Sequence, residues 1–393
     1  MTHYLDNSAT TPLCENARAA MLSVMDENFG NPSSLHAIGV KAQEIVDAAR
    51  KNVLSTFLAA GKRGKPEQLI FTSGGTEANN LAIIGTATAK PRNAGKKIIV
   101  GATEHSSVLQ SANRLKSLGF NVVFIPSPEG VWDMEKYKLE LSSDTILVSA
   151  MLVNNETGAV NDIAKIAAMA RRVNPEAVVH CDAVQGYMRL PKSLFSSADI
   201  VTVSAHKIGG PKGAGALFAS EDIIKRKAII PVIFGGGQEH GLRSGTENVL
   251  GIAGFSAAVE YFGRNQTDIC THFDELYSYA LSRFSELDGI GIKLNIPKTE
   301  RVAHHILSVT AHGVRSETML HFLSSRGVFV SSGSACSSNT KSKSHVLESF
   351  GLSDDDIDST LRLSFGIGTS KDDIDAAAEA FAEGIRTLSH KKG

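Results

Sequence analysis

The sequence has little cysteine and no excess charge of either sign. Its four cysteines are spread over 393 residues, at Cys14, Cys181, Cys270 and Cys336. They share no C-x-x-C spacing, so neither a cysteine-based metal site nor a disulfide framework is expected. Forty Lys and Arg residues stand against 41 Asp and Glu residues, a formal net charge of −1. This balance gives no global field that would recruit nucleic acid or an anionic membrane.

Long apolar runs are also missing. No stretch approaches the roughly 18 apolar residues of a membrane-spanning helix, and the first residues, Met-Thr-His-Tyr-Leu-Asp-Asn, do not resemble a signal peptide. We therefore expect a cytoplasmic protein with reduced thiols. A hydrophobic content of 42% in 393 residues is sufficient for a large core. At roughly 150 residues per domain, the length favours two or three units, or one large domain carrying a smaller one.

Short apolar runs alternate with helix-like stretches over the first two thirds of the chain. This alternation predicts an α/β fold with a largely parallel sheet covered on both faces. Ligand groups then gather at the carboxyl edge of the strands. The predicted strands are 68–71, 97–100, 122–125, 145–150, 177–180, 200–203 and 216–219, and helical spacing is clear over 78–87 and 164–173.

The last third of the chain has a different texture. Residues 229–247 are rich in glycine and lack periodicity, which predicts a loop before a helix that begins near Asn248. After about Arg264 come a long helical run over 267–287, short strand-like pieces at 306–309 and 327–330, and an Ala-rich closing helix over 372–388. A second domain is expected to start there.

Polar segments follow the predicted strands directly. The first is Thr72-Ser73-Gly74-Gly75-Thr76-Glu77-Ala78-Asn79. Its backbone N–H groups and the Thr76 hydroxyl can bind a phosphate at the positive end of a helix. An ordinary helix cap after a tight turn is the alternative interpretation. The segment does not fit the Walker motif, because no lysine follows the second glycine.

Three further segments bring chemically active side chains to the same edge. His105 follows the strand at 97–100, where it can stack on a flat ring, shuttle a proton or simply cap a helix. Asp182 ends an apolar strand, where a carboxylate is costly to bury. Lys207 stands in Ser204-Ala205-His206-Lys207-Ile208-Gly209-Gly210. Apolar neighbours lower the pKa of an amine and favour Schiff-base formation, and a lysine with a buried aspartate matches the needs of pyridoxal phosphate.

These motifs resemble those of cysteine desulfurases of the NifS/IscS type, which depend on pyridoxal phosphate and belong to the class V aminotransferase superfamily. The resemblance covers nearly the whole chain in order. Beyond the segments already named, it rests on Tyr4–Thr11, Gly30–Ser34, Asn154–Gly158, Arg243–Asn248, Ser331–Ser338 and Leu361–Gly366. It implies a PLP-transferase fold of type I, with a mostly parallel seven-stranded central sheet. A large PLP-binding domain would span 15–264, and a smaller α+β domain would be formed by 1–14 and 265–393.

The resemblance also implies a role for each matching residue. Lys207 would bind the cofactor covalently and move the substrate's α-proton, and Asp182 would keep the ring nitrogen protonated. His105 would stack on the ring and Gln185 would hydrogen-bond its phenolic oxygen. The phosphate would be bound by Gly75, Thr76, Ser204 and His206, together with the partner's Thr246, which implies a homodimer. The substrate carboxylate would be bound by Asn155 and Arg362.

Cys336 would carry the step that distinguishes this enzyme class. It lies among small polar residues, a setting typical of a mobile loop and unlike that of a buried structural cysteine. As a thiolate it would take sulfur from L-cysteine, release L-alanine and hold a persulfide for an acceptor protein. Cys14, Cys181 and Cys270 lack such a setting and are expected to be structural. The acceptor stays open among an iron-sulfur scaffold, a tRNA-thiolation enzyme and another sulfur carrier.

Two positions depart from the family pattern. Gly75 stands where relatives often carry alanine, and Ile367 follows Gly366 where a basic residue is expected, which bears on the geometry near Arg362. The alternatives are a selenocysteine lyase, a class V aminotransferase and a non-catalytic scaffold or regulatory partner. Cys336 argues against an aminotransferase, since transamination needs no thiol. A scaffold would be expected to have lost one of the three cofactor-binding side chains that this sequence retains.

Overall fold

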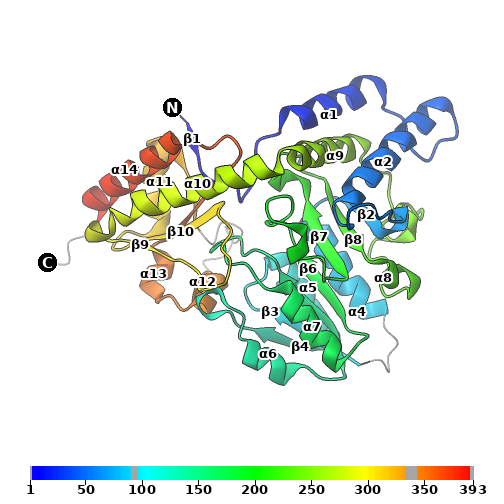
Figure 1. Ribbon diagram of the computed structural model, residues 1–393, viewed down its shortest axis with the longest axis horizontal. Helices are drawn as coiled ribbons and strands as arrows, with labels where there is room; N and C mark the ends of the chain where they lie inside the picture. The colour runs from blue at the N-terminus through cyan, green and yellow to red at the C-terminus, as the bar shows by residue number, and fades with distance from the viewer. Residues whose placement is uncertain (1, 90–94, 333–342, 390–393) are drawn as a thin grey trace.

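Three β-sheets, of seven, four and two strands, organise the chain (Figure 1). The computed structural model describes residues 2–89, 95–332 and 343–389. The strands are β1 (His3–Tyr4), β2 (Leu69–Thr72), β3 (Lys97–Gly101), β4 (Asn121–Ile125), β5 (Thr145–Met151), β6 (Val178–Asp182), β7 (Ile200–Ser204), β8 (Gly215–Ala219), β9 (Ile292–Leu294), β10 (Ile306–Ala311), β11 (Val328–Phe329), β12 (Ser331–Ser332) and β13 (Thr360–Ser364).

Helices connect the strands and cover the sheets. They are α1 (Glu15–Glu27), α2 (Ala37–Ser55), α3 (Gly75–Asn80), α4 (Thr86–Ala89), α5 (Ser106–Ser117), α6 (Met134–Glu140), α7 (Ile163–Val173), α8 (Glu221–Lys225), α9 (Val249–Arg264), α10 (Gln266–Ser285), α11 (Ser316–Ser325), α12 (His345–Phe350), α13 (Asp354–Asp358) and α14 (Lys371–Leu388). None of the described helices is both long enough and apolar enough to cross a membrane.

The large sheet has the strand order β2-β8-β7-β6-β5-β3-β4. Neighbours from β7 to β4 are parallel, whereas β8 runs antiparallel to both β7 and β2. Six of the seven strands therefore point the same way, and the carboxyl ends of β2, β3, β5, β6 and β7 share one edge. All seven strands predicted from apolar runs are present, and the prediction of a mostly parallel seven-stranded sheet is confirmed.

Both faces of this sheet are buried, because alternate residues of each strand enter different cores. Phe71 and Ile99 belong to one buried cluster with residues of α2, α7 and α9. Their neighbours Ile70 and Ile98 belong to a second cluster with residues of α3, α5 and α8. A strand that is apolar on both sides is typical of a parallel sheet between two helical layers. This double burial explains why the strands read as continuous apolar runs.

The predicted helices are present with small shifts at their ends. The helical spacing over 78–87 lies within one helical stretch from α3 to α4, interrupted by a π-helical turn over Leu81–Gly85. In the glycine-rich segment 229–247 the one helical element is the short turn Glu239–Gly241. The glycine-rich segment is followed by Asn248, whose side chain accepts a hydrogen bond from the Gly251 N–H at 3.0 Å and so caps α9.

The smaller sheet has the order β12-β13-β10-β9 and its pairs are antiparallel. In Figure 1 it lies beside α10, α11 and α14, with α10 running from this region to α9. β1 pairs with β11, so the amino-terminal segment joins this part of the chain. The division into domains 15–264 and 1–14 with 265–393 stays a prediction.

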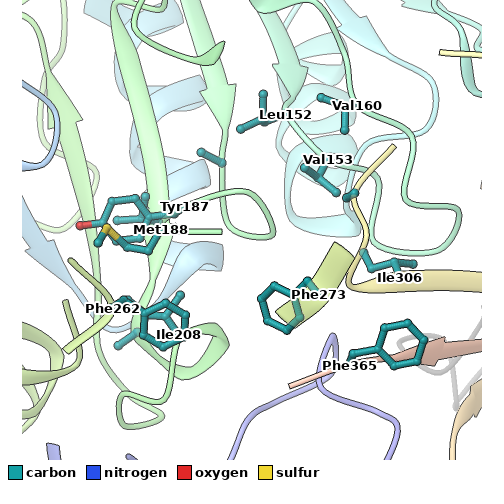
Figure 2. Close-up of a cluster of buried hydrophobic side chains, with 14 of the residues drawn as sticks. Leu152, Val153, Val160, Tyr187, Met188, Ile208, Phe262, Phe273, Ile306 and Phe365 are labelled. Atoms are coloured by element: carbon teal, nitrogen blue, oxygen red, sulfur yellow. The ribbon is translucent and has the colours of Figure 1, made fainter. Parts of the chain in front are cut away.

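A single buried cluster links the two sheets. Figure 2 shows Leu152 and Val153, which follow β5, together with Ile306 of β10 and Phe273 of α10. Phe365, directly after β13, belongs to the same cluster. The carboxyl edge of the large sheet is therefore packed against the smaller sheet without a break in the core.

A buried ion pair fixes the glycine-rich segment to β2. Arg50 donates to both oxygens of the Glu239 carboxylate, at 2.6 and 2.8 Å, and each residue is 5% exposed. The Phe71 N–H also donates to Glu239, at 2.9 Å, and the Arg50 guanidinium stacks on the Phe71 ring. Because every charge here is paired, removal of one partner leaves the other buried without compensation.

We predict that Glu239→Gln destabilises the protein by about 3 kcal/mol, because the Arg50 cation stays buried while the acceptor for Phe71 is retained. Urea unfolding measures the change. The double variant Arg50→Met with Glu239→Gln removes the unpaired buried cation. Its loss in the free energy of unfolding should be clearly smaller than the sum of the losses of the two single variants. Strict additivity of the two changes would contradict the prediction.

Candidate active site

The loops after β2, β3, β5, β6 and β7 meet at the carboxyl edge of the large sheet. These loops, and the helical turns that follow them directly, carry five of the residues predicted from the sequence: Gly75, His105, Asn155, Gln185 and Lys207. Asp182 and Ser204 are the last residues of β6 and β7. The parallel arrangement thus brings together residues that are up to 132 positions apart, counted from Gly75 to Lys207.

Asp182 is the buried anion at this edge. It is 4% exposed, and every residue of β6 is buried. The Asn79 side-chain amide donates to one carboxylate oxygen at 2.8 Å, and the Val184 N–H donates to the other at 3.0 Å. Asn79 also donates to the Ser107 hydroxyl at 2.9 Å, so one side chain joins Asp182 to the start of α5. These donors satisfy and orient both carboxylate oxygens of Asp182 away from bulk water.

Lys207 lies on the short helical turn Ala205–Lys207 after β7. Its ammonium group donates to the carbonyl oxygens of Ser8 at 2.6 Å and Ala9 at 2.8 Å. Gln185 donates to the same Ser8 carbonyl at 2.9 Å. The amino-terminal segment therefore forms one wall of the site.

Arg189 supports this arrangement from inside the core. It donates to the Gln185 side-chain oxygen at 3.1 Å and to the carbonyl of Lys207. Burial lowers the pKa of Arg189 to about 10, which still leaves the guanidinium charged at neutral pH. A buried cation therefore holds the main chain of Lys207 and the amide of Gln185 in place.

His105 occupies the N-cap position of α5. Its Nδ1 lies 2.8 Å from the Ser107 hydroxyl and accepts the Ser107 N–H at 3.2 Å. Burial lowers the pKa of His105; the Asp182 charge opposes this effect, while Lys207 and His345 act in the same direction as burial. The imidazole is thus neutral at neutral pH. Since both Asp182 and Lys207 act on its charge, His105 lies within electrostatic reach of both.

Four of the predicted phosphate-site residues line one cavity of about 420 Å³. These four residues are Gly75, Thr76, Ser204 and His206, and Lys212 and Gly213 line the same cavity. Burial lowers the pKa of His206 to about 4, with contributions from the charges of Lys207, Lys212 and Arg189. This imidazole is therefore neutral and serves as a hydrogen-bonding group.

The cavity fits a bound phosphate and ring in two respects. The Ser204 hydroxyl is buried with no hydrogen-bond partner within the described part of the chain, so it has a free donor. A Cβ added to Gly75 would lie 3.0 Å from Val184 Cγ2, so the glycine lets the start of α3, with its N–H groups, approach the ends of β6 and β7 closely beside the cavity. An unpaired buried hydroxyl, a neutral imidazole and Lys212 are suitable partners for a phosphate.

Thr246 lies apart from that cavity in this chain. It is exposed and lines a neighbouring cavity of about 180 Å³ with Thr72 and Arg243. Ser73 and Gly213 border both cavities. The predicted contribution of Thr246 to the site of a partner subunit stays a prediction.

Arg362 and Asn155 meet at the side of the smaller sheet. Arg362, on β13, donates to the carbonyl of Asn155 at 2.8 Å and pairs with the Asp6 carboxylate at 2.6 Å. Arg362 is 6% exposed and its Nε has no partner among the described residues. The guanidinium is thus oriented by two acceptors and retains a free donor.

Glu156 is a buried carboxyl group that the sequence did not single out. The Ser344 hydroxyl donates to it at 2.6 Å. Burial raises the pKa of Glu156 to about 7, against the opposing effects of Ser344 and of the Arg362 charge. Asn79, Arg189, Ser344 and His345 were also not predicted, because each acts through contacts with residues distant in sequence. Asn79 and Glu156 nevertheless lie inside two segments already identified, Thr72–Asn79 and Asn154–Gly158.

Cys336 lies outside the described residues. Of the other three cysteines, Cys14 and Cys181 are buried and Cys270 is partly buried. Burial raises the pKa of the Cys181 and Cys270 thiols, so both are protonated at neutral pH. Protonated thiols are poor nucleophiles, which agrees with the structural role predicted for these two cysteines.

Comparison with known proteins agrees with this geometry. The family model of class-V aminotransferases matches residues 3–377. The chain is 36% identical to the putative cysteine desulfurase IscS 1 of Bacillus subtilis strain 168, over 98% of this chain and 99% of the relative. Among solved structures, a NifS-like protein superposes with a TM-score of 0.88 at 30% identity, covering 99% of this chain and all of the other. A structure of SspA in complex with cysteine gives a TM-score of 0.77 at 30% identity, covering 93% of this chain and 99% of that chain.

The chain belongs to the class-V aminotransferase family. Within it, the full-length matches identify a cysteine desulfurase, an enzyme class that depends on pyridoxal phosphate. The fold, the enzyme class and the cofactor expected from the sequence are confirmed. The roles of individual residues stay predictions.

We predict that Glu156 makes stability depend on pH. Its pKa is about 7 in the folded protein and 4.5 as an ordinary glutamate, so the folded state holds a proton that the unfolded chain releases in this window. As pH rises from about 4.5 to about 7, the free energy of unfolding of the wild type should fall relative to Glu156→Gln by on the order of 3 kcal/mol.

Urea unfolding at several pH values measures this difference. Glu317→Gln is a suitable control, because the Glu317 side chain is 75% exposed. Parallel stability curves for the wild type and Glu156→Gln would contradict the prediction.

Proposed function

We propose that this chain converts L-cysteine to L-alanine with pyridoxal phosphate bound at the carboxyl edge of the large sheet, and that Cys336 receives the sulfur. One observation carries the assignment of the site. A buried carboxylate and a lysine ammonium come from the ends of the neighbouring strands β6 and β7, and both act on the charge of a neutral imidazole on the loop after β3. The partners of these three groups, Asp182, Lys207 and His105, support the cofactor roles below.

Each part of the cofactor has candidate partners. Gly75, Thr76, Ser204 and His206 would bind the phosphate, which their shared cavity supports. Asp182 would hold the protonated ring nitrogen, because Asn79 and the Val184 N–H fix the position of its carboxylate. A neutral His105 is suited to stack on the ring face. Gln185, oriented by Arg189, would donate to the phenolic oxygen.

When bound, pyridoxal phosphate withdraws the electron pair released at the substrate's α-carbon. Lys207 Nζ would anchor the cofactor and then take the α-proton as general base. The two carbonyls that it now contacts would hold it close to the ring. Asn155 and Arg362 would bind the substrate carboxylate, since a guanidinium held by Asp6 still offers a free Nε.

The sulfur-transfer step balances without an external oxidant. The Cys336 thiolate forms an S–S bond with the substrate sulfur, and the bond between that sulfur and the substrate β-carbon breaks. The electron pair of the broken bond stays on carbon, which takes up a proton to give alanine. Cys336 is left as a persulfide, and the sulfur acceptor would be a separate protein: an iron-sulfur scaffold, a tRNA-thiolation enzyme or another sulfur carrier. The role of Cys336 rests on the sequence motif around it.

We predict that Cys336→Ala abolishes sulfide release from L-cysteine in the presence of a thiol reductant, while the visible absorption of the bound cofactor is retained. Lys207→Ala should lose at least about 100-fold in the rate of alanine formation and bind the cofactor non-covalently. Sulfide and alanine assays measure both variants. Cys270→Ala is the matched cysteine control and should resemble the wild type. Unchanged sulfide release by Cys336→Ala would disprove the assigned nucleophile.

We also propose that the active form is a homodimer. Several large apolar side chains are exposed in this chain, among them Leu35 at 98%, Phe234 at 79% and Phe29 at 76%. Phe234 lies on the glycine-rich segment 229–247, which also carries Thr246. A second copy that covers this segment would bury Phe234 and bring Thr246 towards the neighbouring phosphate site. The cytoplasm, where free thiols stay reduced, is the location that we propose for this dimer.

We predict that Phe234→Asp shifts the protein from dimer to monomer, because the interface would have to bury an unpaired carboxylate. Analytical ultracentrifugation measures the change. Leu139→Asp is the control, since Leu139 lies on α6 and is 84% exposed. A dimer that tolerates Phe234→Asp as well as it tolerates Leu139→Asp would refute the proposed interface.

A further inference from the structure

The start of α12 contacts two loops of the site at once. Ser344, the N-cap residue of α12, accepts the Leu347 N–H at 3.2 Å and donates to Glu156 at 2.6 Å. Ser344 is 6% exposed and Glu156 is 7% exposed, so this hydrogen bond is buried. Glu156 follows Asn155, the residue proposed to bind the substrate carboxylate.

The next residue reaches the loop after β3. His345 Nε2 lies 3.1 Å from the carbonyl oxygen of Glu104 and donates to it, since a carbonyl can only accept. Glu104 is completely buried, and its carboxyl accepts the Met151 N–H of β5 at 2.6 Å. His105, the residue proposed to stack on the cofactor, follows Glu104 directly. A rigid carbonyl therefore connects His345 to His105.

The two loops are also joined to each other. The Asn154 side-chain amide donates to the Thr103 carbonyl at 3.1 Å and accepts the Glu156 N–H at 2.9 Å. We call these three segments, Thr103–His105, Asn154–Thr157 and Ser344–His345, the three-loop junction. Every pair of segments in it is connected by a hydrogen bond. Displacement of one segment therefore disturbs the other two.

We propose that Ser344 and His345 are positioning residues, which hold Asn155 and His105 in the geometry that binds the amino acid and the cofactor ring. This inference rests on the proposed function, because it uses the roles given there to Asn155 and His105. Neither Ser344 nor His345 takes part in bond making. They act through Glu156 and Glu104.

The charges in the junction are consistent with this role. Ser344 acts on Glu156 through its hydrogen bond and Arg362 acts through its charge, and both effects lower the pKa that burial raises. His345 contributes to the low pKa of His105. The beginning of α12 thus affects both the substrate loop and the stacking imidazole, although Asn155 and His105 follow different strands of the sheet.

Binding of L-alanine, the reaction product, tests the Ser344 arm without sulfur transfer. The holoenzyme with Cys336→Ala is titrated with L-alanine at about pH 8, and the cofactor absorbance is followed. Ser344→Ala, introduced into the Cys336→Ala holoenzyme, should raise the Kd for L-alanine about tenfold, because the buried hydrogen bond to Glu156 is lost. Added Ser344→Thr keeps the hydroxyl and should remain within about twofold of the parent.

Two variants separate this role from simple helix capping. Aspartate caps a helix as well as serine does, but at this pH it faces an ionised Glu156, so Ser344→Asp should weaken L-alanine binding at least as much as Ser344→Ala. Ser353 caps α13 by accepting the Asp356 N–H and has no hydrogen bond to the site within the described part of the chain, so Ser353→Ala should bind normally. Normal binding by Ser344→Asp, or weak binding by Ser353→Ala, would overturn the inference.

The visible absorption maximum of the holoenzyme tests the His345 arm. His345→Ala removes the donor to Glu104 and should shift the maximum, whereas His345→Gln, which retains a donor of similar reach, should restore it. An unchanged spectrum in His345→Ala would overturn this arm. Failure of the proposed function is a separate result, since wild-type protein would then release no sulfide whatever the junction variants do.

Discussion

Asp182 ends a strand in which every residue is buried, so its carboxylate depends entirely on donors supplied by the fold. Asn79 on α3 and the Val184 N–H provide them, and Asn79 also fixes the start of α5 at Ser107. A parallel sheet makes this possible, because helices that follow neighbouring strands begin beside the same edge. The rest of the site is arranged around this one stabilised negative charge.

Two cations contribute to the site at different depths, since Arg189 is 3% exposed and Lys207 is only partly buried. Lys207 reaches the amino-terminal carbonyls, and Arg189 holds the Lys207 main chain from inside the core. Arg189 remains charged although burial lowers its pKa, so it serves as a permanent anchor. Lysine is better suited than arginine to chemistry, since its amine gives up its proton far more readily. The site thus separates a structural cation from a reactive one.

The sequence predicted most of the sheet and much of the site, for definite reasons. Each of the seven strands is apolar on both faces, so it is recognised without knowledge of its neighbours, and Lys207 and Asp182 stand directly after such strands. The antiparallel direction of β8 leaves no trace in the apolar pattern. β13 was recognised only as a motif, because Arg362 interrupts its apolar run. Glu156 and Ser344 were missed because their importance comes from a contact across 188 positions.

The wall that holds Lys207 joins the two ends of the chain. Ser8 N–H donates to the hydroxyl of Ser364 at 2.8 Å, and Asp6 pairs with Arg362. During synthesis on the ribosome, Ser364 is made long after the strands that carry Asp182 and Lys207. A nascent chain therefore has the chemical groups of the large sheet but lacks the complete pocket around the reactive amine until Ser364 has been made.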